Sequence, residues 1–156
     1  MGVKAASSDQ GLTEKAVARF QSGYNCAQSV LLTLYEYLEP EGDSDLIPKI
    51  AAGFGGGIGR CSSACGALTG SVMAVGIKYA SNEAGIEKRQ EAYTKAKKLF
   101  EQFEKQNGTV LCRDLIKYDF SNPEEAAKAR QEKVFEKVCA NLIKSAIENF
   151  LELENK

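Results

Sequence analysis

This 156-residue chain contains five cysteines: Cys26, Cys61, Cys65, Cys112 and Cys139. Their thiols are its candidates for strongly nucleophilic side chains and for ligands of soft metal ions. The sequence contains no histidine. This excludes Ser-His and Cys-His catalytic pairs, imidazole ligands for zinc or haem, and the c-type haem attachment motif. Redox or soft-metal chemistry in this protein would therefore depend on sulfur.

Two of the cysteines lie at predicted helix starts. Cys26 follows Asn25, a predicted N-cap, and Cys65 begins the sequence CGALTG at 65–70. Free backbone amides and the positive end of the helix dipole favour a thiolate at such a place, so we predict a lowered pKa for both thiols. The alternative for either one is a small buried hydrophobic residue.

The other three cysteines have weaker local signals. Cys139 lies beside an apolar helical stripe, which favours a core position, and Cys112 stands next to Arg113 in a segment of undecided conformation. Cys61 lies in a serine-rich loop and is interpreted as an extra thiol. Because Cys-x-x-Cys pairs, ferredoxin runs and zinc-ribbon doublets are missing, spacing alone supports a four-cysteine metal site only weakly.

Helical periodicity predicts the elements that must position these cysteines. The whole chain, residues 1–156, reads as one all-α domain of about five to seven helices. The first helix is expected from about residue 9 to Gly23, and the second from Asn25, with Gln28 completing a capping box, to Pro40.

A central helix is predicted after the glycine-rich segment 53–59. Ser62 or Ser63 would cap it, and it would run to about Ala80. Its residues are apolar or small on every side, as expected for an enclosed helix. Gly66 and Gly70 leave one face nearly bare, so another helix can approach closely.

Two further helices are predicted in the C-terminal half, separated by a short segment at 109–120 that is either helical or extended. One spans 86–106, with one apolar face formed by Ile86, Tyr93, Ala96, Phe100 and Phe103. The other starts at the Asn122-Pro123 pair, typical of an N-cap followed by the first helical position, and continues unbroken to about Leu153.

The glycine-rich segment does not match a nucleotide-binding loop. It lacks the Gly-Lys-Ser/Thr ending of a P-loop and the full glycine pattern of a dinucleotide fingerprint. We expect its glycines to let the backbone pass close to helices or to the cysteines. Anion binding near the helix start, with help from Arg60, stays open, and Tyr24 is expected to line a pocket near Cys26.

Composition narrows the classes of partner. The chain is 44% hydrophobic and 26% charged with a net charge of -1, so a nucleic-acid partner is not expected. We find no secretory signal or segment suited to membrane insertion, and we predict a cytoplasmic protein. An odd, scattered set of cysteines in a reducing compartment favours metal binding or redox chemistry over permanent disulfides.

The motif CGALTG, the separated cysteines, and the segments GYNCAQ at 23–28 and FGGGIG at 54–59 resemble the C_GCAxxG_C_C family of small redox-active proteins. This resemblance implies that Cys26, Cys65, Cys112 and Cys139 form one site. Cys61 departs from the pattern.

The resemblance implies a thiol- or metal-cluster-based oxidoreductase site. Those four cysteines would carry dithiol–disulfide exchange or hold an iron–sulfur cluster or zinc, with Cys65 the most nucleophilic thiol or the first ligand. The glycines expected beside the cofactor are Gly55, Gly56, Gly57, Gly66 and Gly70. The redox partner is unidentified, and the long helices leave room for a homodimer. Two alternatives stay open: a non-catalytic iron–sulfur or zinc protein, and a helical interaction module with inert core cysteines.

Overall fold

The computed structural model describes residues 5–156, with side chains from Asp9 onward. The described residues form eight α-helices and no β-strand: α1 (Ala5–Gln21), α2 (Cys26–Leu38), α3 (Ile47–Ala51), α4 (Gly66–Tyr79), α5 (Gln90–Asn107), α6 (Cys112–Ile116), α7 (Pro123–Gln131) and α8 (Ala140–Glu154). The all-α prediction is confirmed, with one helix more than the expected range.

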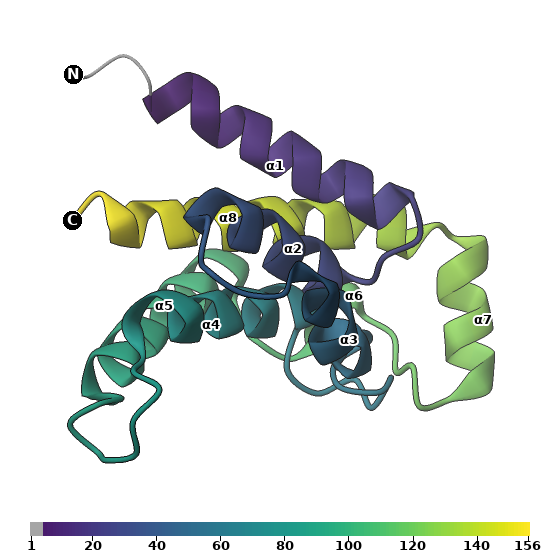
Figure 1. Ribbon diagram of the computed structural model, residues 1–156. Coiled ribbons are helices and arrows are strands. Elements are labelled where there is room, and N and C mark those ends of the chain that lie inside the picture. Colours follow the sequence, from purple (N-terminus) through teal and green to yellow (C-terminus); the bar gives the residue numbers. More distant parts are fainter. Residues whose placement is uncertain (1–4) are drawn as a thin grey trace.

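The long helices α1 and α8 lie side by side and run in opposite directions, while α2 and α4 form the most extensive helix pair. Helix α7 stands at one end of the molecule and connects α6 to the start of α8 (Figure 1). The short helices α3 and α6 lie near this end as well. Most of the cysteine-bearing segments therefore meet beside α7.

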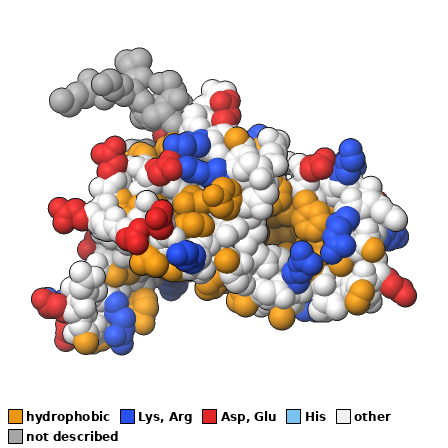
Figure 2. Space-filling view, turned by 45° about the vertical axis from the view of Figure 1, so that its right-hand side comes forward, with side chains coloured by type: hydrophobic (Ala, Val, Ile, Leu, Met, Phe, Trp, Pro, Cys, Tyr) orange, Lys and Arg blue, Asp and Glu red, His pale blue; other side chains and the backbone are white. Residues whose placement is uncertain are grey.

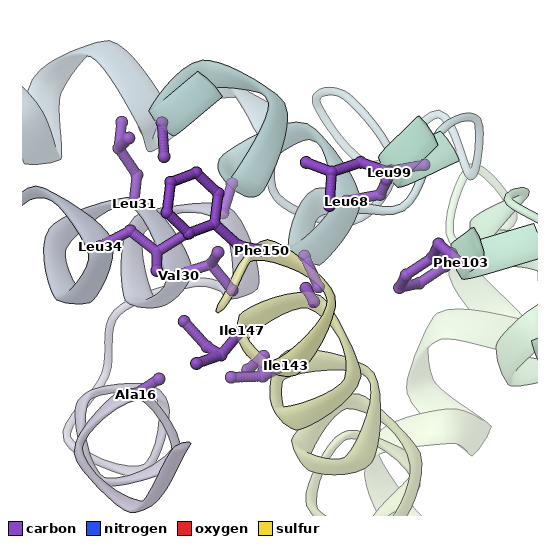
Figure 3. Close-up of a cluster of buried hydrophobic side chains, with 14 of the residues drawn as sticks. Ala16, Val30, Leu31, Leu34, Leu68, Leu99, Phe103, Ile143, Ile147 and Phe150 are labelled. Carbon is purple, nitrogen blue, oxygen red and sulfur yellow. The ribbon is translucent and has the colours of Figure 1, made fainter. Parts of the chain in front are cut away.

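Helix α8 supplies the apolar face around which the core forms (Figure 3). Ile143, Ile147 and Phe150 project from it toward Val30 and Leu34 of α2. All five side chains are fully buried. Their spacing along α8 places them on one helical face, as the periodicity predicted.

The predicted start of α2 is confirmed in detail. The Asn25 side chain accepts a hydrogen bond from the Gln28 amide at 2.9 Å, and the Gln28 side chain accepts one from the Asn25 amide at 3.0 Å. This is a complete capping box, which satisfies two amides left without partners at a helix start. Asn25 also donates to the Ala52 carbonyl, which ties the cap to the chain just before the glycine-rich segment.

Helix α4 starts later than predicted. Its N-cap is Cys65, and the expected serine caps are wrong: Ser62 instead accepts a hydrogen bond from the Phe120 amide. The bare face is confirmed, because a methyl group built at Gly70 would lie 2.8 Å from the Ala27 carbonyl oxygen. The glycines of α4 thus allow its backbone to lie directly against α2.

Helix α5 begins at Gln90, several residues later than expected, and its predicted apolar face is only partly correct. Ile86, Tyr93 and Phe100 are exposed, whereas Leu99 and Phe103 are buried. Because α5 packs against α4 and α8 on one side only, the buried stripe is narrow. The aromatic residues beside it remain in solvent.

The single long helix predicted for 122–153 is wrong. Asn122 caps α7 as expected, but the chain turns at Lys133, which has a left-handed φ of 55°. A π-helical turn (Phe135–Cys139) then leads into α8. The turn separates α7 from α8, so that α7 packs Ala126 and Ala129 against a second apolar cluster containing Phe120, Cys112 and Cys139.

Within residues 5–156, none of the helices combines the length and apolar character needed to span a bilayer.

Candidate functional site

Four cysteines line one cavity of about 440 Å³. They come from four places in the chain: Cys26 begins α2, Cys65 caps α4, Cys112 begins α6 and Cys139 ends the π-helical turn. We call this cavity the cysteine pocket. Cys61 does not line it and is exposed, so the fifth thiol lies outside the site, as the sequence indicated.

Cys65 and Cys112 are held together by a short antiparallel pairing of the backbone. The Cys65 amide donates to the Val110 carbonyl at 2.8 Å, and the Cys112 amide donates to the Ser63 carbonyl at 2.6 Å. Ala64 and Leu111 form the bridge between these two bonds. This pairing brings two cysteines that are distant in the sequence onto adjacent backbone segments. The segment 109–120, which the sequence left undecided, thus pairs at Leu111 and then forms the short helix α6.

The glycine-rich segment forms a left-handed turn beside the pocket. Five consecutive residues, 56–60, have φ values between 56° and 71°, including Ile58 and Arg60. Side-chain-bearing residues pay roughly 1–2 kcal/mol each in this conformation. Gly57 is also sterically required, because a methyl group there would lie 2.7 Å from Cys112 Cβ. The sequence predicted the close approach but not the left-handed conformation.

The Cys26 sulfur lies where two helix starts and the glycine-rich segment meet. Burial raises the pKa of its thiol, and backbone N–H groups of Gly56 in the left-handed turn, Ala27 in α2 and Gly66 in α4 oppose this rise. A methyl group built at Gly66 would lie only 2.3 Å from this sulfur. Cys26, more than Cys65, is therefore the thiol best surrounded by groups that stabilise a negative charge.

Burial nevertheless outweighs these amides, so the predicted lowering of the two pKa values is wrong in net direction. Burial raises the pKa of Cys26 despite its four backbone N–H groups. It also raises the pKa of Cys65 to about 12, helped by negative charge on Cys26 and opposed by the amides of Leu68 and Ala67. Without a bound cation, both thiols keep their protons at neutral pH.

The remaining two pocket thiols behave in the same way. Burial, followed by charge on Cys26, raises the pKa of Cys112 to about 12. Burial, followed by charge on Cys26, Cys65 and Cys112, raises the pKa of Cys139 further. The pKa values of Cys65, Cys112 and Cys139 thus all respond to charge on Cys26, which places the four sulfurs close enough to interact electrostatically.

The glycines expected beside a cofactor divide into two groups. Gly55, Gly56 and Gly66 line the pocket, whereas Gly57 packs against Cys112 from outside it and Gly70 packs against α2. Tyr24 was expected to line the pocket near Cys26, and this is wrong. Its side chain is exposed and does not contribute to the pocket lining.

Two arginines that spacing did not connect also line the pocket. Arg60 is the last residue of the left-handed turn and Arg130 lies near the end of α7. No Asp or Glu lines the cavity, and its other walls are largely apolar. Figure 2 shows a hollow with an orange interior and Lys or Arg side chains along one edge. The cysteine pocket is therefore an apolar cavity with a positive rim.

Two kinds of metal site use four cysteine ligands, a single zinc ion and an iron–sulfur cluster. One zinc ion requires four thiolates about 2.3 Å from a common point. In residues 5–156, no group of three or more Cys, Asp or Glu side chains is arranged to hold one metal ion. In an iron–sulfur cluster, by contrast, four cysteines bind different iron atoms and stand farther apart. The four cysteines around this cavity supply the number and type of ligands that such a cluster uses.

Comparison with known proteins places this chain in a family. Residues 24–153 match the family model described as "Putative redox-active protein (C_GCAxxG_C_C)". The chain belongs to this family. The match spans all four pocket cysteines and both arginines of this C_GCAxxG_C_C protein, and it confirms the resemblance seen in the sequence.

One relative of this C_GCAxxG_C_C protein is described as an uncharacterized protein from Archaeoglobus fulgidus. The two are 32% identical over 99 residues, which cover 58% of this chain and 64% of the relative. The chain thus spans somewhat less than two thirds of the length of that relative. No solved structure gives a significant match.

The raised thiol pKa values predict how stability responds to pH. In the metal-free, reduced protein, unfolded cysteines lose their protons near pH 9, whereas folded Cys65 and Cys112 keep theirs to about pH 12. The folded state therefore binds more protons in this window, and the free energy of unfolding falls as pH rises through it. Urea unfolding measured from pH 7 to 10.5 should show this decline.

Two variants serve to isolate the contribution of the thiols. Cys65→Ala removes one shifted group, so its stability should fall less steeply with pH. Cys61→Ala removes an exposed thiol and should reproduce the wild-type slope. Equal slopes for the two variants would contradict the assigned burial of the Cys65 thiol.

Proposed function

We propose that this protein is a redox protein whose four pocket cysteines, Cys26, Cys65, Cys112 and Cys139, hold an iron–sulfur cluster. The observation that carries the proposal is the convergence of these four side chains, from four separate elements, on one cavity. Membership of a family described as redox-active supports it. Such a cluster, when bound, supplies reversible one-electron transfer.

The side chains of the chain have distinct parts in this proposal. The four cysteines become ligands by losing their protons to solvent as the metal binds, because only the thiolate is a ligand. The backbone amides of Gly56, Ala27 and Gly66 help to stabilise the charge on Cys26. The stacked rings of Phe120 and Phe135, with centroids 5.0 Å apart, form part of the apolar wall of the pocket.

Dithiol–disulfide exchange and a zinc site are the alternatives. Exchange requires an accessible thiolate, whereas all four pocket thiols have raised pKa values. A zinc ion requires a tighter group of donors than the described residues provide. Both alternatives therefore rank below the cluster.

The test is metal and sulfide analysis of the full-length chain purified without oxygen. We expect iron and acid-labile sulfide in equal amounts, with a brown colour that bleaches on chelation. Stoichiometric zinc in a colourless protein would contradict the proposal in favour of a structural site. A metal-free protein in which two of the four thiols convert reversibly to a disulfide would contradict it in favour of exchange.

A further inference from the structure

We propose that the cysteine pocket binds a small organic anion, whose acidic group pairs with Arg60 and Arg130 and whose apolar body lies against the pocket wall. The inference that this anion binds at a redox site rests on the proposed function. The inference that the cavity binds an anion rests on three features of the cavity.

The first feature is charge without a counter-charge. Arg60 and Arg130 both line the cavity, and no acidic side chain does. Neither arginine takes part in any of the ion pairs or side-chain hydrogen bonds of the described residues. Since the chain as a whole has a net charge of -1, this positive rim is not a consequence of a basic protein.

The second feature is the way in which the fold directs both arginines to the same place. Ala126 and Arg130 are four residues apart on α7 and both line the cavity, so they share the helix face that closes it. The stem of Arg60 lies directly over Gly56: a methyl group built at Gly56 would lie 2.9 Å from Arg60 Cγ. A side chain at that position would force the Arg60 stem to move.

The third feature is the chemistry of the cavity between the arginines and the cysteines. Phe120, Phe135, Ile116 and Leu142 line it, and its volume of about 440 Å³ lies in the range of small-molecule sites. A guanidinium group binds a carboxylate or phosphate through paired hydrogen bonds. The pocket therefore suits a ligand with an acidic head and an apolar body, which a simple inorganic anion lacks.

The experiment measures binding of four probes to the full-length chain by ligand-observed NMR: benzoate, phenyl phosphate, the neutral benzamide, and acetate. We expect at least one of the two aromatic anions to bind ten times more tightly than benzamide, and acetate to bind more weakly than benzoate. The preferred aromatic anion identifies the head group as carboxylate or phosphate. Equal binding of the aromatic anions and benzamide, or no binding, overturns the inference.

Variants assign the effect to the two arginines. Arg60→Gln and Arg130→Gln should each weaken binding of the preferred anion about tenfold and leave benzamide unchanged. Arg89→Gln removes the same charge from an exposed residue that lies over Tyr93, outside the pocket, and should change neither. If Arg60→Gln and Arg130→Gln lose iron but still prefer the anion to benzamide, the two arginines only balance the charge of the cluster, and the inference is overturned.

Failure of this inference can be told apart from failure of the proposed function. Binding is measured both on protein isolated without oxygen and on protein from which iron has been removed. A chain that never contains iron but still prefers the aromatic anion refutes the cluster and retains the anion site. A chain with a full cluster and no such preference does the reverse.

Discussion

Replacing Cys26, Cys65, Cys112 or Cys139 by serine is expected to remove most of the bound iron, whereas Cys61→Ser retains all of it. The four pocket thiols lie around one cavity, and the fifth is exposed outside it. A serine hydroxyl does not ionise near neutral pH and is a poor ligand for iron in a cluster. Each pocket substitution therefore leaves one iron position without its ligand.

The series is measured as iron and sulfide per chain together with the visible spectrum, on variants purified without oxygen. Serine is close to cysteine in size, so far-UV circular dichroism should match the wild type in all five variants. Cys61→Ser is the matched control, since it has the same chemical change a few residues from Cys65. If it lost as much iron as the pocket variants, the assignment of four ligands would fail.

The same series also ranks the four ligands. Charge on Cys26 raises the pKa of Cys65, Cys112 and Cys139, and backbone amides surround its own sulfur. We therefore expect the Cys26 variant to bind iron most weakly. The sequence favoured Cys65 for this part because of its place on the central helix, but fewer backbone amides lower the pKa of this buried thiol at the N-cap of α4.

Local signals in the sequence were sufficient wherever one short segment determines the structure. The Asn25 and Gln28 pair predicted the start of α2, and Asn122 with Pro123 predicted the start of α7. Both are capping motifs whose hydrogen bonds close within three residues. Convergence of the cysteines was reached differently, through the family resemblance, because no spacing rule connects residues so far apart.

The sequence was insufficient where backbone strain or burial decides the structure. Lys133, Ile58 and Arg60 all have a left-handed φ, although their residue types give no such indication. The turn at Lys133 is what swings α7 away from α8 and brings Arg130 to the pocket. Likewise, the helix dipole at Cys65 could be read from the sequence, but the larger opposing effect of burial depends on the whole fold.

Gly66→Ala is expected to destabilise the protein and to remove the bound iron, although alanine is a better helix former than glycine. Its methyl group would meet the Cys26 sulfur at 2.3 Å, and it would also lie 3.0 Å from the Phe54 carbonyl oxygen and 3.3 Å from the Ala27 amide nitrogen. Because backbone closes two sides, the methyl group can be accommodated only if the sulfur turns away. We expect a loss of about 1–3 kcal/mol in the free energy of unfolding, as for other overpacked cores, together with loss of iron.

Gly76→Ala is the matched control on the same helix. Nothing lies within 4 Å of a methyl group built at Gly76, so the substitution should stabilise α4 by roughly 0.5–1 kcal/mol through helix propensity and keep the full iron content. Urea unfolding and iron analysis on both variants make the comparison. Equal stability and equal iron content in the two would mean that the Cys26 sulfur does not occupy the space beside Gly66, and the amide-lined position assigned to it would be wrong. If Gly66→Ala loses stability and iron while Gly76→Ala gains stability and keeps its iron, the absence of a side chain at Gly66 is what makes room for the Cys26 sulfur.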